Sequence, residues 1–345
     1  MLDDLKYIHH RDSLDALGVA ERQWQQLLLE FDTTNYKLKT TNIQNVVYAG
    51  MGGSALAAEL SKIWPGCNVP FEIWRQYQLP GYVSKNTLVI CASYSGNTEE
   101  ALSALAEAQE RGAQIAIICG GGQLQKIAEE QSLPMLLLPK IAQPRWGVLA
   151  NFKALLAILV AAGLIDKEAQ NQVQLAADFL KKEVGAWLPT VATKENPAKS
   201  LAHELAGKSP VIYSGPLLFP AAYKWKINFN ENAKNIAWCG QLPEFNHNEF
   251  IGWSSHPIQK PYEVIDLRSS FEDQQISKRL VLSDRLLSGK RPAAHVVEAK
   301  GDSLLEQLVW AVAYGDFVSI YLALLNGVDP GPVALVEKFK TELTK

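Results

Sequence analysis

The chain has 345 residues, of which 48% are hydrophobic and 20% are charged, a balance typical of an ordinary globular protein. Its formal net charge of −3 gives no overall basic field, so neither nucleic acid nor a membrane is an expected partner. The N-terminus lacks the apolar segment of a signal peptide, and no run of about 18 apolar residues predicts a membrane span. The four cysteines form no CxxC pair, which argues against a zinc or redox motif and favours a reduced, cytoplasmic location.

The first half of the chain alternates between strand-like and helix-like segments. A helical, amphipathic stretch at residues 1–44 comes first. Short apolar runs among helical segments then predict strands at 45–50, 71–75, 88–93, 114–120 and 134–139. Continuous apolar strands separated by helices are typical of a parallel sheet covered on both faces.

The second half repeats this plan. A helical span at about residues 149–207 precedes strand candidates at 209–215, 235–240, 262–267 and 294–299 and a long apolar helix at 303–326. We therefore expect an α/β fold with two flavodoxin-like subdomains, each a parallel β-sheet flanked by helices. The first subdomain is expected at residues 1–155, including the helical N-terminal stretch, and the second at residues 156–345.

The segment LVICASYSGNTE (residues 88–99) is the clearest indication of a binding site. Its strand-like run ends in three hydroxyl side chains, Ser93, Ser95 and Thr98, with Gly96 among them and a helix-prone segment behind them. Small hydroxyl groups and backbone N–H groups at a helix N-terminus favour an anion, because the helix carries a partial positive charge there. The segment therefore predicts binding of a phosphorylated small molecule. The alternative is that Thr98 only caps the helix.

A glycine-rich turn, GMGGS, follows the first predicted strand. Gly52 and Gly53 allow a tight turn and a close approach of a ligand to the backbone. The spacing also matches the GxGxxG/A pattern of dinucleotide-binding proteins, which requires an acidic residue at the end of the second strand. Here Glu72 is in mid-strand and Arg75 follows the strand. A phosphate turn, a dinucleotide site and a purely structural turn all remain open on these residues alone.

GMGGS after the first strand and SYSGNTEE after the third resemble the sugar isomerase (SIS) domain, whose members bind phosphosugars on a flavodoxin-like parallel sheet. Later motifs narrow the resemblance to the bifunctional phosphoglucose/phosphomannose isomerases, proteins with two SIS-type subdomains. These motifs are QPRW (143–146), NFNENAK (228–234), PEFNHNEFIGW (243–253) and DPGPVALVEKFK (329–340). The resemblance extends from about residue 45 to the C-terminus. Two departures are Ala55, where the family often has glycine, and Trp146, where a small residue usually follows QPR.

The resemblance implies an aldose–ketose isomerase that converts glucose 6-phosphate, and mannose 6-phosphate, to fructose 6-phosphate through a cis-enediolate. It implies no metal and no redox cofactor. By the same resemblance, Glu231 is the base and His247 opens the sugar ring. The histidine comes from the neighbouring subunit in this family, which implies a homodimer. Arg145 is expected near the enediolate oxygen, and Lys340 near the sugar ring. Without the resemblance, each of these side chains could be an ordinary surface or loop residue.

The phosphate group of such a substrate needs hydroxyl and backbone N–H donors, because hydrogen bonds from these groups to an ionised phosphate are strong. The glycine-rich turn and the SYSGNT segment supply donors of this kind. The predicted phosphate ligands are Gly52, Gly53, Ser54, Ser93, Ser95 and Thr98.

Two other functions use parts of the same sequence. A non-catalytic phosphosugar sensor could be built on this domain, but such regulators usually add a DNA-binding helix-turn-helix. The chain is acidic overall, which is a poor electrostatic footprint for DNA. An NAD(P)-dependent oxidoreductase would use the glycine-rich turn. The sensor gives no role to the NENAK and NHNE motifs, and the dinucleotide interpretation gives none to SYSGNT.

Overall fold

The structure, a computed structural model, describes residues 1–34, 36, 38, 42–255 and 261–343. The chain forms two compact units. The first unit comprises residues 22–179, and the second comprises residues 1–21 and 180–345. The subdomain boundary expected at residues 155 and 156 stays a prediction; by packing, residues 1–21 go with the second unit.

The first unit contains one sheet of five parallel strands in the order β2-β1-β3-β4-β5. Every strand predicted for the first half of the chain is present. Their bounds are β1 (Asn45–Gly50), β2 (Phe71–Trp74), β3 (Thr87–Ser93), β4 (Gln114–Cys119) and β5 (Met135–Leu137). Among the described residues of this unit, the helical elements are η1 (Gln23–Leu28), α3 (Gly52–Ile63), α4 (Glu99–Glu110), α5 (Gly122–Gln131), η3 (Pro144–Trp146) and α6 (Val148–Ala161).

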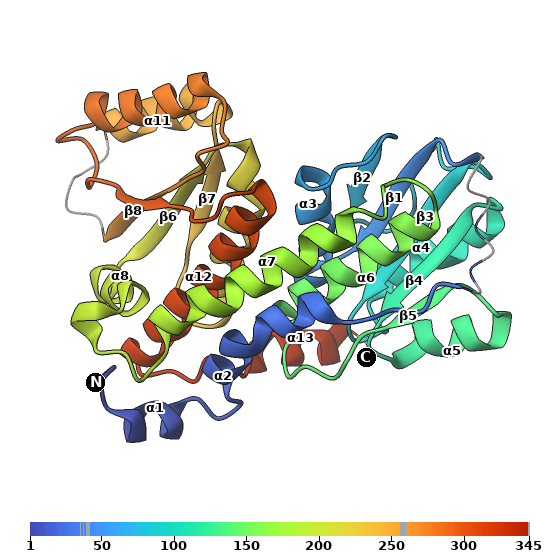
Figure 1. Cartoon of the computed structure of the whole chain (residues 1–345), viewed down its shortest axis with the longest axis horizontal. Helices are drawn as coiled ribbons and strands as arrows, with labels where there is room; N and C mark the ends of the chain where they lie inside the picture. Colours follow the sequence, from blue (N-terminus) through green and yellow to red (C-terminus); the bar gives the residue numbers. More distant parts are fainter. Residues whose placement is uncertain (35, 37, 39–41, 256–260, 344–345) are drawn as a thin grey trace. The chain divides into compact units, whose positions relative to one another are not determined.

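Helices cover both faces of this sheet, as a parallel sheet requires (Figure 1). Alternate residues of a strand point to opposite faces. Accordingly, Tyr48 and Ile90 pack with α3 and α6 on one face, whereas Val89 and Cys91 pack with α4 and α5 on the other. Strand β3 is buried along its whole length, up to Ser93, where the SYSGNT segment begins.

The second unit contains a four-stranded parallel sheet in the order β7-β6-β8-β9. Its strands are β6 (Ser209–Ser214), β7 (Trp238–Gln241), β8 (Tyr262–Arg268) and β9 (His295–Glu298). Helix α7 (Ala169–Glu183) contains the boundary between the units. The other helices are α1 (Leu5–Arg11), α2 (Ala16–Arg22), α8 (Pro197–Leu205), α9 (Phe219–Glu231), α10 (Glu249–Gly252), α11 (Gln274–Leu286), α12 (Leu304–Leu325) and α13 (Ala334–Leu343), with short helices η4 (Val184–Trp187), η5 (Thr193–Glu195), η6 (Pro216–Leu218), η7 (Glu244–His247) and η8 (Trp253–Ser255). The expected α/β fold with two parallel sheets is thus confirmed.

One strand of the second unit differs from its expected position. The sequence predicts a strand at 235–240, but β7 begins at Trp238. Lys234 has a left-handed backbone with φ of 51°, and the N–H of Asn235 donates to the carbonyl of Phe229 at 3.0 Å. These residues therefore form the turn that ends α9 and cannot join the strand ladder.

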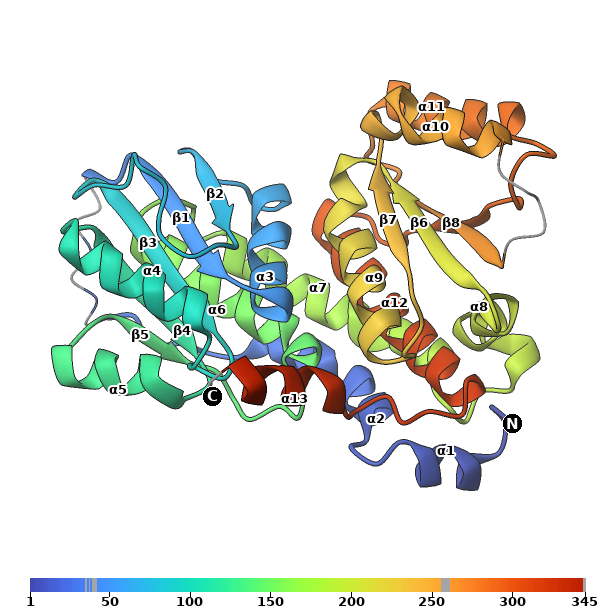
Figure 2. The same cartoon turned by 180° about the vertical axis from the view of Figure 1, so that it is seen from behind.

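Helix α12 forms the core of the second unit. A capping box between Ser303 and Glu306 fixes its start. Figure 2 shows it beside α9, behind the sheet. Among the described residues, α12 is the one helix long and apolar enough to cross a membrane, but 94% of its most apolar window is buried inside the protein. A buried core helix passes the same test.

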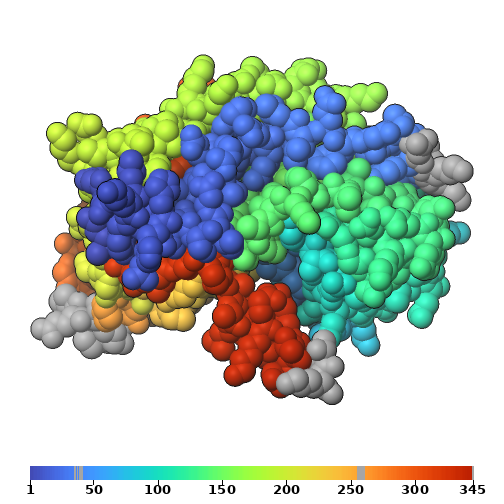
Figure 3. Space-filling view, turned by 90° about the horizontal axis from the view of Figure 1, so that it is seen from below, coloured from blue at the N-terminus to red at the C-terminus, as the bar shows by residue number. Residues whose placement is uncertain are grey.

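The N-terminal residues are fastened to the second unit by polar contacts. Lys199, fully buried, pairs with the Asp3 carboxylate at 3.0 Å, and the Tyr7 hydroxyl donates to the carbonyl of Leu324 at 2.6 Å. Leu14 packs against Gly331. Figure 3 shows these N-terminal residues next to the segment that follows α12.

Gly315 in α12 provides the space for the indole of Trp225, whose Nε1 donates to the Ala311 carbonyl at 2.7 Å. A Cβ at position 315 would lie 2.1 Å from that Nε1. We expect Gly315→Ala to reduce the free energy of unfolding by about 1–3 kcal/mol, because overpacking outweighs the better helix propensity of alanine. Thermal and urea unfolding measure it. Gly185→Ala is the matched control, because nothing lies within 4 Å of its Cβ. Equal stability of both variants would contradict this account.

Candidate functional site

The candidate site lies at the carboxyl ends of β1 and β3, the two central strands of the first sheet. From β1 the chain continues to β2 on one side, and it then crosses to β3 on the other. In open parallel sheets, ligands bind at such a point, because the loops after the two strands separate there. The glycine-rich turn follows β1 and the SYSGNT segment follows β3, with Gly50 opposite Ala92 in the ladder.

Buried polar side chains form hydrogen bonds with the backbone of the glycine-rich turn. Gly52 has a left-handed backbone with φ of 48°, a conformation that favours glycine. Ser54 is buried, and its carbonyl accepts hydrogen bonds from the Tyr48 hydroxyl at 2.8 Å and from the Asn151 amide at 2.9 Å. The first turn of α3 is therefore fixed in place.

The three hydroxyl side chains of the SYSGNT segment form a cluster. The Ser93 Oγ lies 2.7 Å from the Thr98 Oγ1 and 3.3 Å from the Ser95 Oγ, and it accepts the N–H of Gly96 at 3.1 Å. Thr98 occupies the N-cap position of α4, but its side chain makes no capping hydrogen bond. The alternative that Thr98 serves as a helix cap is therefore wrong for its side chain, which faces the serines instead.

One hydrogen bond joins the turn to the segment. The backbone N–H of Tyr94 donates to the Ser54 Oγ at 3.1 Å. The structure thus brings together four of the predicted ligands, Ser54, Ser93, Ser95 and Thr98, beside the N-terminus of α3. Hydroxyl groups and helix N-termini arranged in this way can hold an oxyanion such as phosphate.

The backbone of Arg145 packs on the glycine-rich turn. The arginine lies in η3, it is 1% exposed, and a Cβ on Gly53 would be 3.1 Å from its backbone nitrogen. The Arg145 Nη1 donates to the Gln143 Oε1 at 3.0 Å, and the guanidinium carbon lies 5.0 Å from the Trp146 ring centre. A buried cation requires partners of this kind. Trp146, a departure from the usual small residue, therefore supports the arginine.

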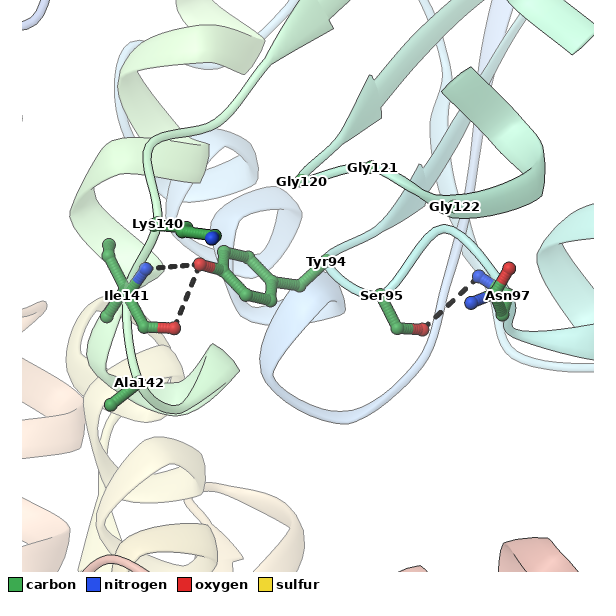
Figure 4. Close-up of a pocket in the computed structure, with 9 residues that line it drawn as sticks. All are labelled: Tyr94, Ser95, Asn97, Gly120, Gly121, Gly122, Lys140, Ile141 and Ala142. Carbon is green, nitrogen blue, oxygen red and sulfur yellow. Dashed lines mark hydrogen bonds between the residues drawn. The ribbon is translucent and has the colours of Figure 1, made fainter. Parts of the chain in front are cut away.

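A pocket of about 570 Å³ opens beside the hydroxyl cluster (Figure 4). Three segments line it, and the backbones of two of them pack closely together. Gly96 has φ of 67°, and a Cβ there would lie 1.7 Å from the carbonyl oxygen of Gly121. The Asn97 side chain accepts the N–H of Gln123 at 2.9 Å. The lining residues are Tyr94, Ser95, Asn97, Gly120, Gly121, Gly122, Lys140, Ile141 and Ala142.

The other predicted site residues belong to the second unit. Glu231 is the last residue of α9 and is partly buried. One helix face of α9 places Lys224, Asn228 and Asn232 against α12, where the first two bind the Asp316 carboxylate and Asn232 donates to the Ser319 Oγ at 2.9 Å. This buried polar contact fixes the position of α9 along α12 and hence the place of its last residue.

Two of the sequence motifs meet at the end of α9. The Lys234 ammonium donates to the Glu231 carbonyl at 3.0 Å and to the Asp329 carbonyl at 2.6 Å. NENAK and DPGPVALVEKFK are therefore joined in the second unit. Lys340 lies further along the latter motif, on α13, where it is exposed and pairs with Glu337 at 3.1 Å. An exposed pair of this kind stabilises little.

His247 ends η7 and is exposed. The two residues before it are anchored, because Phe245 is buried in the core and the Asn246 amide donates to the Ser283 Oγ at 3.0 Å. An exposed imidazole next to anchored residues can contact another molecule.

The corresponding edge of the second sheet carries different chemistry. The register of β6 with β8 places Ser214 opposite Leu267, as Gly50 is opposite Ala92 in the first sheet. By this correspondence Leu217 takes the place of Gly53. Its N–H donates at 3.2 Å to the Glu272 carboxylate, which packs directly on Gly215. A carboxylate of the chain itself already occupies this turn, whereas the first sheet presents hydroxyl groups.

The residues that a dinucleotide site would use are engaged in other contacts. Arg75, after β2, pairs with the Glu59 carboxylate, and Glu72 lies within β2 and accepts the Tyr82 hydroxyl. In the described strand β2, which ends at Trp74, no acidic side chain stands at the end, where a nucleotide ribose would need one.

Sequence reasoning missed the supporting residues Tyr48, Tyr94 and Asn151. Tyr94 lies within the SYSGNT segment, but the prediction for this segment depends on its hydroxyl groups and glycine alone. Tyr48 and Asn151 look like ordinary strand and helix residues, and only their contacts with Ser54 give them a role.

Comparison with known protein families supports this placement of the motifs. Residues 41–165 match the SIS domain, and residues 194–343 match the bacterial phospho-glucose isomerase C-terminal SIS domain. The two matches lie on the two sheets described above.

Curated relatives cover most of the chain. A bifunctional phosphoglucose/phosphomannose isomerase from Caldicellulosiruptor bescii is 34% identical over 316 residues, which is 89% of this chain and 92% of the relative. A D-glucosamine-6-phosphate 4-epimerase from Sulfolobus acidocaldarius is 35% identical over 230 residues, 65% of this chain and 70% of that protein. Among solved structures, a glucose-6-phosphate isomerase like protein from Thermus thermophilus has a TM-score of 0.64 at 20% identity, covering 99% of this chain and 98% of that one, which shows a shared fold.

Gly53 tests whether the glycine-rich turn binds anions. A Cβ there would lie 3.1–3.2 Å from backbone atoms of Pro144 and Arg145, so the turn or η3 must shift. We expect Gly53→Ala to weaken binding of inorganic phosphate about tenfold, or about 1.4 kcal/mol, in titration calorimetry. Gly81→Ala is the control, because its Cβ meets nothing within 4 Å. If the two variants bind phosphate equally well, the turn is not part of the anion site.

Proposed function

Since this chain belongs to the bifunctional phosphoglucose/phosphomannose isomerase family, and is therefore an isomerase, we propose that it interconverts glucose 6-phosphate and mannose 6-phosphate with fructose 6-phosphate. The observation that carries the proposal is the hydroxyl cluster of Ser93, Ser95 and Thr98, which lies beside the N-terminus of α3 and is joined to Ser54 through Tyr94. In the proposal these groups, with the N–H groups of Gly52 and Gly53, hold the phosphate of the sugar.

The reaction moves a proton between C1 and C2 of the sugar through a cis-enediolate. It needs a base over these carbons, and the family resemblance assigns that role to Glu231. Its fixed place at the end of α9 supports the assignment, because a base must be held at a defined position. Both aldoses give the same enediolate, so acting on both requires only that the site accept either configuration at C2.

The developing negative charge on the enediolate oxygen needs a cation nearby. The resemblance assigns this role to Arg145, and its burial beside the glycine-rich turn supports the assignment, because a desolvated guanidinium stabilises charge more strongly than an exposed one. Lys340 is assigned to the sugar ring region.

Ring opening requires a proton donor, which the proposal assigns to His247 of a neighbouring subunit. The exposed imidazole on an anchored loop supports a role in contact with another molecule. The proposed protein is accordingly a homodimer, and its location is the cytoplasm, where sugar phosphates are available.

The proposed reaction uses no metal and no redox cofactor, because the proton shift can be performed by side chains alone. Among the residues that the structure describes, no group of three or more His, Cys, Asp or Glu side chains could hold a metal ion.

The first experiment compares three substrates on the purified protein. We expect formation of fructose 6-phosphate from glucose 6-phosphate and from mannose 6-phosphate, measured in a coupled assay, with equal rates before and after treatment with a chelator. Glucosamine 6-phosphate is the third arm, because of the epimerase relative. A protein that acts only on glucosamine 6-phosphate, or one that a chelator inactivates, would contradict the proposal.

The second experiment tests the base. We expect Glu231→Gln to bind phosphate as the wild type does and to lose turnover by roughly 10²–10⁴-fold, the usual contribution of a general base. Glu204→Gln, an exposed change on α8 in the same unit, is the control and should keep full turnover. Wild-type turnover in the Glu231 variant would remove the residue from the mechanism. In D₂O, deuterium at C2 of the aldose or at C1 of the ketose supports the enediolate, because the proton carried by the base exchanges with solvent.

A further inference from the structure

Tyr94 makes hydrogen bonds to several loops around the proposed phosphate site in the first unit. Its N–H donates to Ser54 of the glycine-rich turn at 3.1 Å, and its carbonyl accepts the N–H of Gly120 at 2.9 Å. Its neighbours in sequence are Ser93 and Ser95 of the hydroxyl cluster. The backbone of this one residue thus connects three loops.

The side chain of Tyr94 reaches a fourth segment. Figure 4 shows the ring extending from the SYSGNT segment to residues 140–142. The hydroxyl accepts the N–H of Ile141, and its single proton is shared between the carbonyls of Ile141 at 2.9 Å and Pro139 at 3.0 Å. Burial raises the pKa of Tyr94, so the hydroxyl keeps this proton at neutral pH.

The segment that Tyr94 holds leads directly to Arg145. Ile141 lies four residues before the arginine, and its side chain packs on Gly147, two residues after it: a Cβ on Gly147 would be 2.9 Å from the Ile141 Cδ1. Between these two points, Gln143 and Trp146 hold the guanidinium. A shift of Ile141 would therefore move the loop that carries Arg145.

We infer that Tyr94 is a positioning residue for the isomerase reaction: its hydroxyl holds Ile141 in place, and thereby sets the Arg145 guanidinium relative to the phosphate-binding hydroxyl cluster. The inference rests on the proposed function, in which Arg145 faces the enediolate oxygen. Its physical basis is that the phosphate anchors one end of the sugar and the arginine acts at the other. The distance between the phosphate anchor and the guanidinium then decides how well the transition state is stabilised. A small displacement of either group therefore lowers the rate.

The test is Tyr94→Phe, which removes one oxygen atom and keeps the ring. We expect kcat for glucose 6-phosphate to fall about tenfold, the affinity for inorganic phosphate to change less than about twofold, and the melting temperature to stay within a few degrees. Tyr82→Phe is the matched control in the same unit, since its hydroxyl binds only the surface carboxylate of Glu72 among the contacts described. It should leave kcat unchanged.

A double-mutant cycle separates positioning from a general structural role. If Tyr94 acts through Arg145, removal of its hydroxyl should change kcat less than about twofold in an Arg145→Met background. An equal loss in both backgrounds, no loss in either, or a loss of phosphate affinity that matches the loss of kcat would each overturn the inference.

A measurement without turnover keeps this inference separate from the proposed function. We expect amide hydrogen exchange in the peptide around residues 139–147 to be faster in Tyr94→Phe than in the wild type and in Tyr82→Phe. Unchanged exchange would refute the positioning role even in a fully active enzyme. The wild type could also fail to convert any sugar phosphate while exchange is still faster in Tyr94→Phe. That result would contradict the proposed function alone, and the contact of Tyr94 with residues 139–147 would stand.

Discussion

The parallel pairing of β1 with β3 is the constraint on which the candidate site depends. Because Gly50 lies opposite Ala92, the loops that follow the two strands start side by side at one edge of the sheet. The sheet is buried on both faces there, so neither loop can slide relative to the other without breaking the core. The Tyr94–Ser54 hydrogen bond then joins the loops above the strands. Every further contact of the site builds on this register.

The two units share an architecture but not the chemistry of their edges. Each has a central pair of parallel strands in corresponding register, with a loop of the same length before the next helix. In the first unit that loop contributes hydroxyl groups. In the second it contributes Glu272, whose carboxylate accepts the N–H of Leu217. In the second unit, an anionic side chain of the chain itself therefore occupies the turn. The proposed phosphate site is therefore assigned to the first unit alone.

Each unit contains a buried cationic side chain. Arg145 in the first unit and Lys224 in the second are both about 1% exposed, a situation that is unfavourable unless partners compensate for the lost hydration. Arg145 lies against Trp146 and Gln143, and Lys224 pairs with Asp316. For the Lys224–Asp316 pair, the Coulombic gain roughly balances the desolvation cost, so the pair fixes geometry rather than adds stability. Arg145 has a role of its own in the proposed reaction, and Lys224 lies on the helix that ends at Glu231.

The sequence by itself determined the α/β class and nearly all strands, and it predicted an anion site at the SYSGNT segment. These features follow from local patterns: apolar runs of strand length, helical periodicity, and small polar residues after a strand. The predicted start of β7 is wrong because Lys234 adopts a left-handed turn that no propensity signals. The side chain of Thr98 faces Ser93 instead of capping α4, because a nearby hydroxyl competes for it. Only the tertiary structure decided that Tyr94 ties Ser54 to Ile141, that Trp146 stacks on Arg145, and that Glu272 fills the second turn. Most of these contacts join residues far apart in the chain, and a one-dimensional pattern carries no record of such distances.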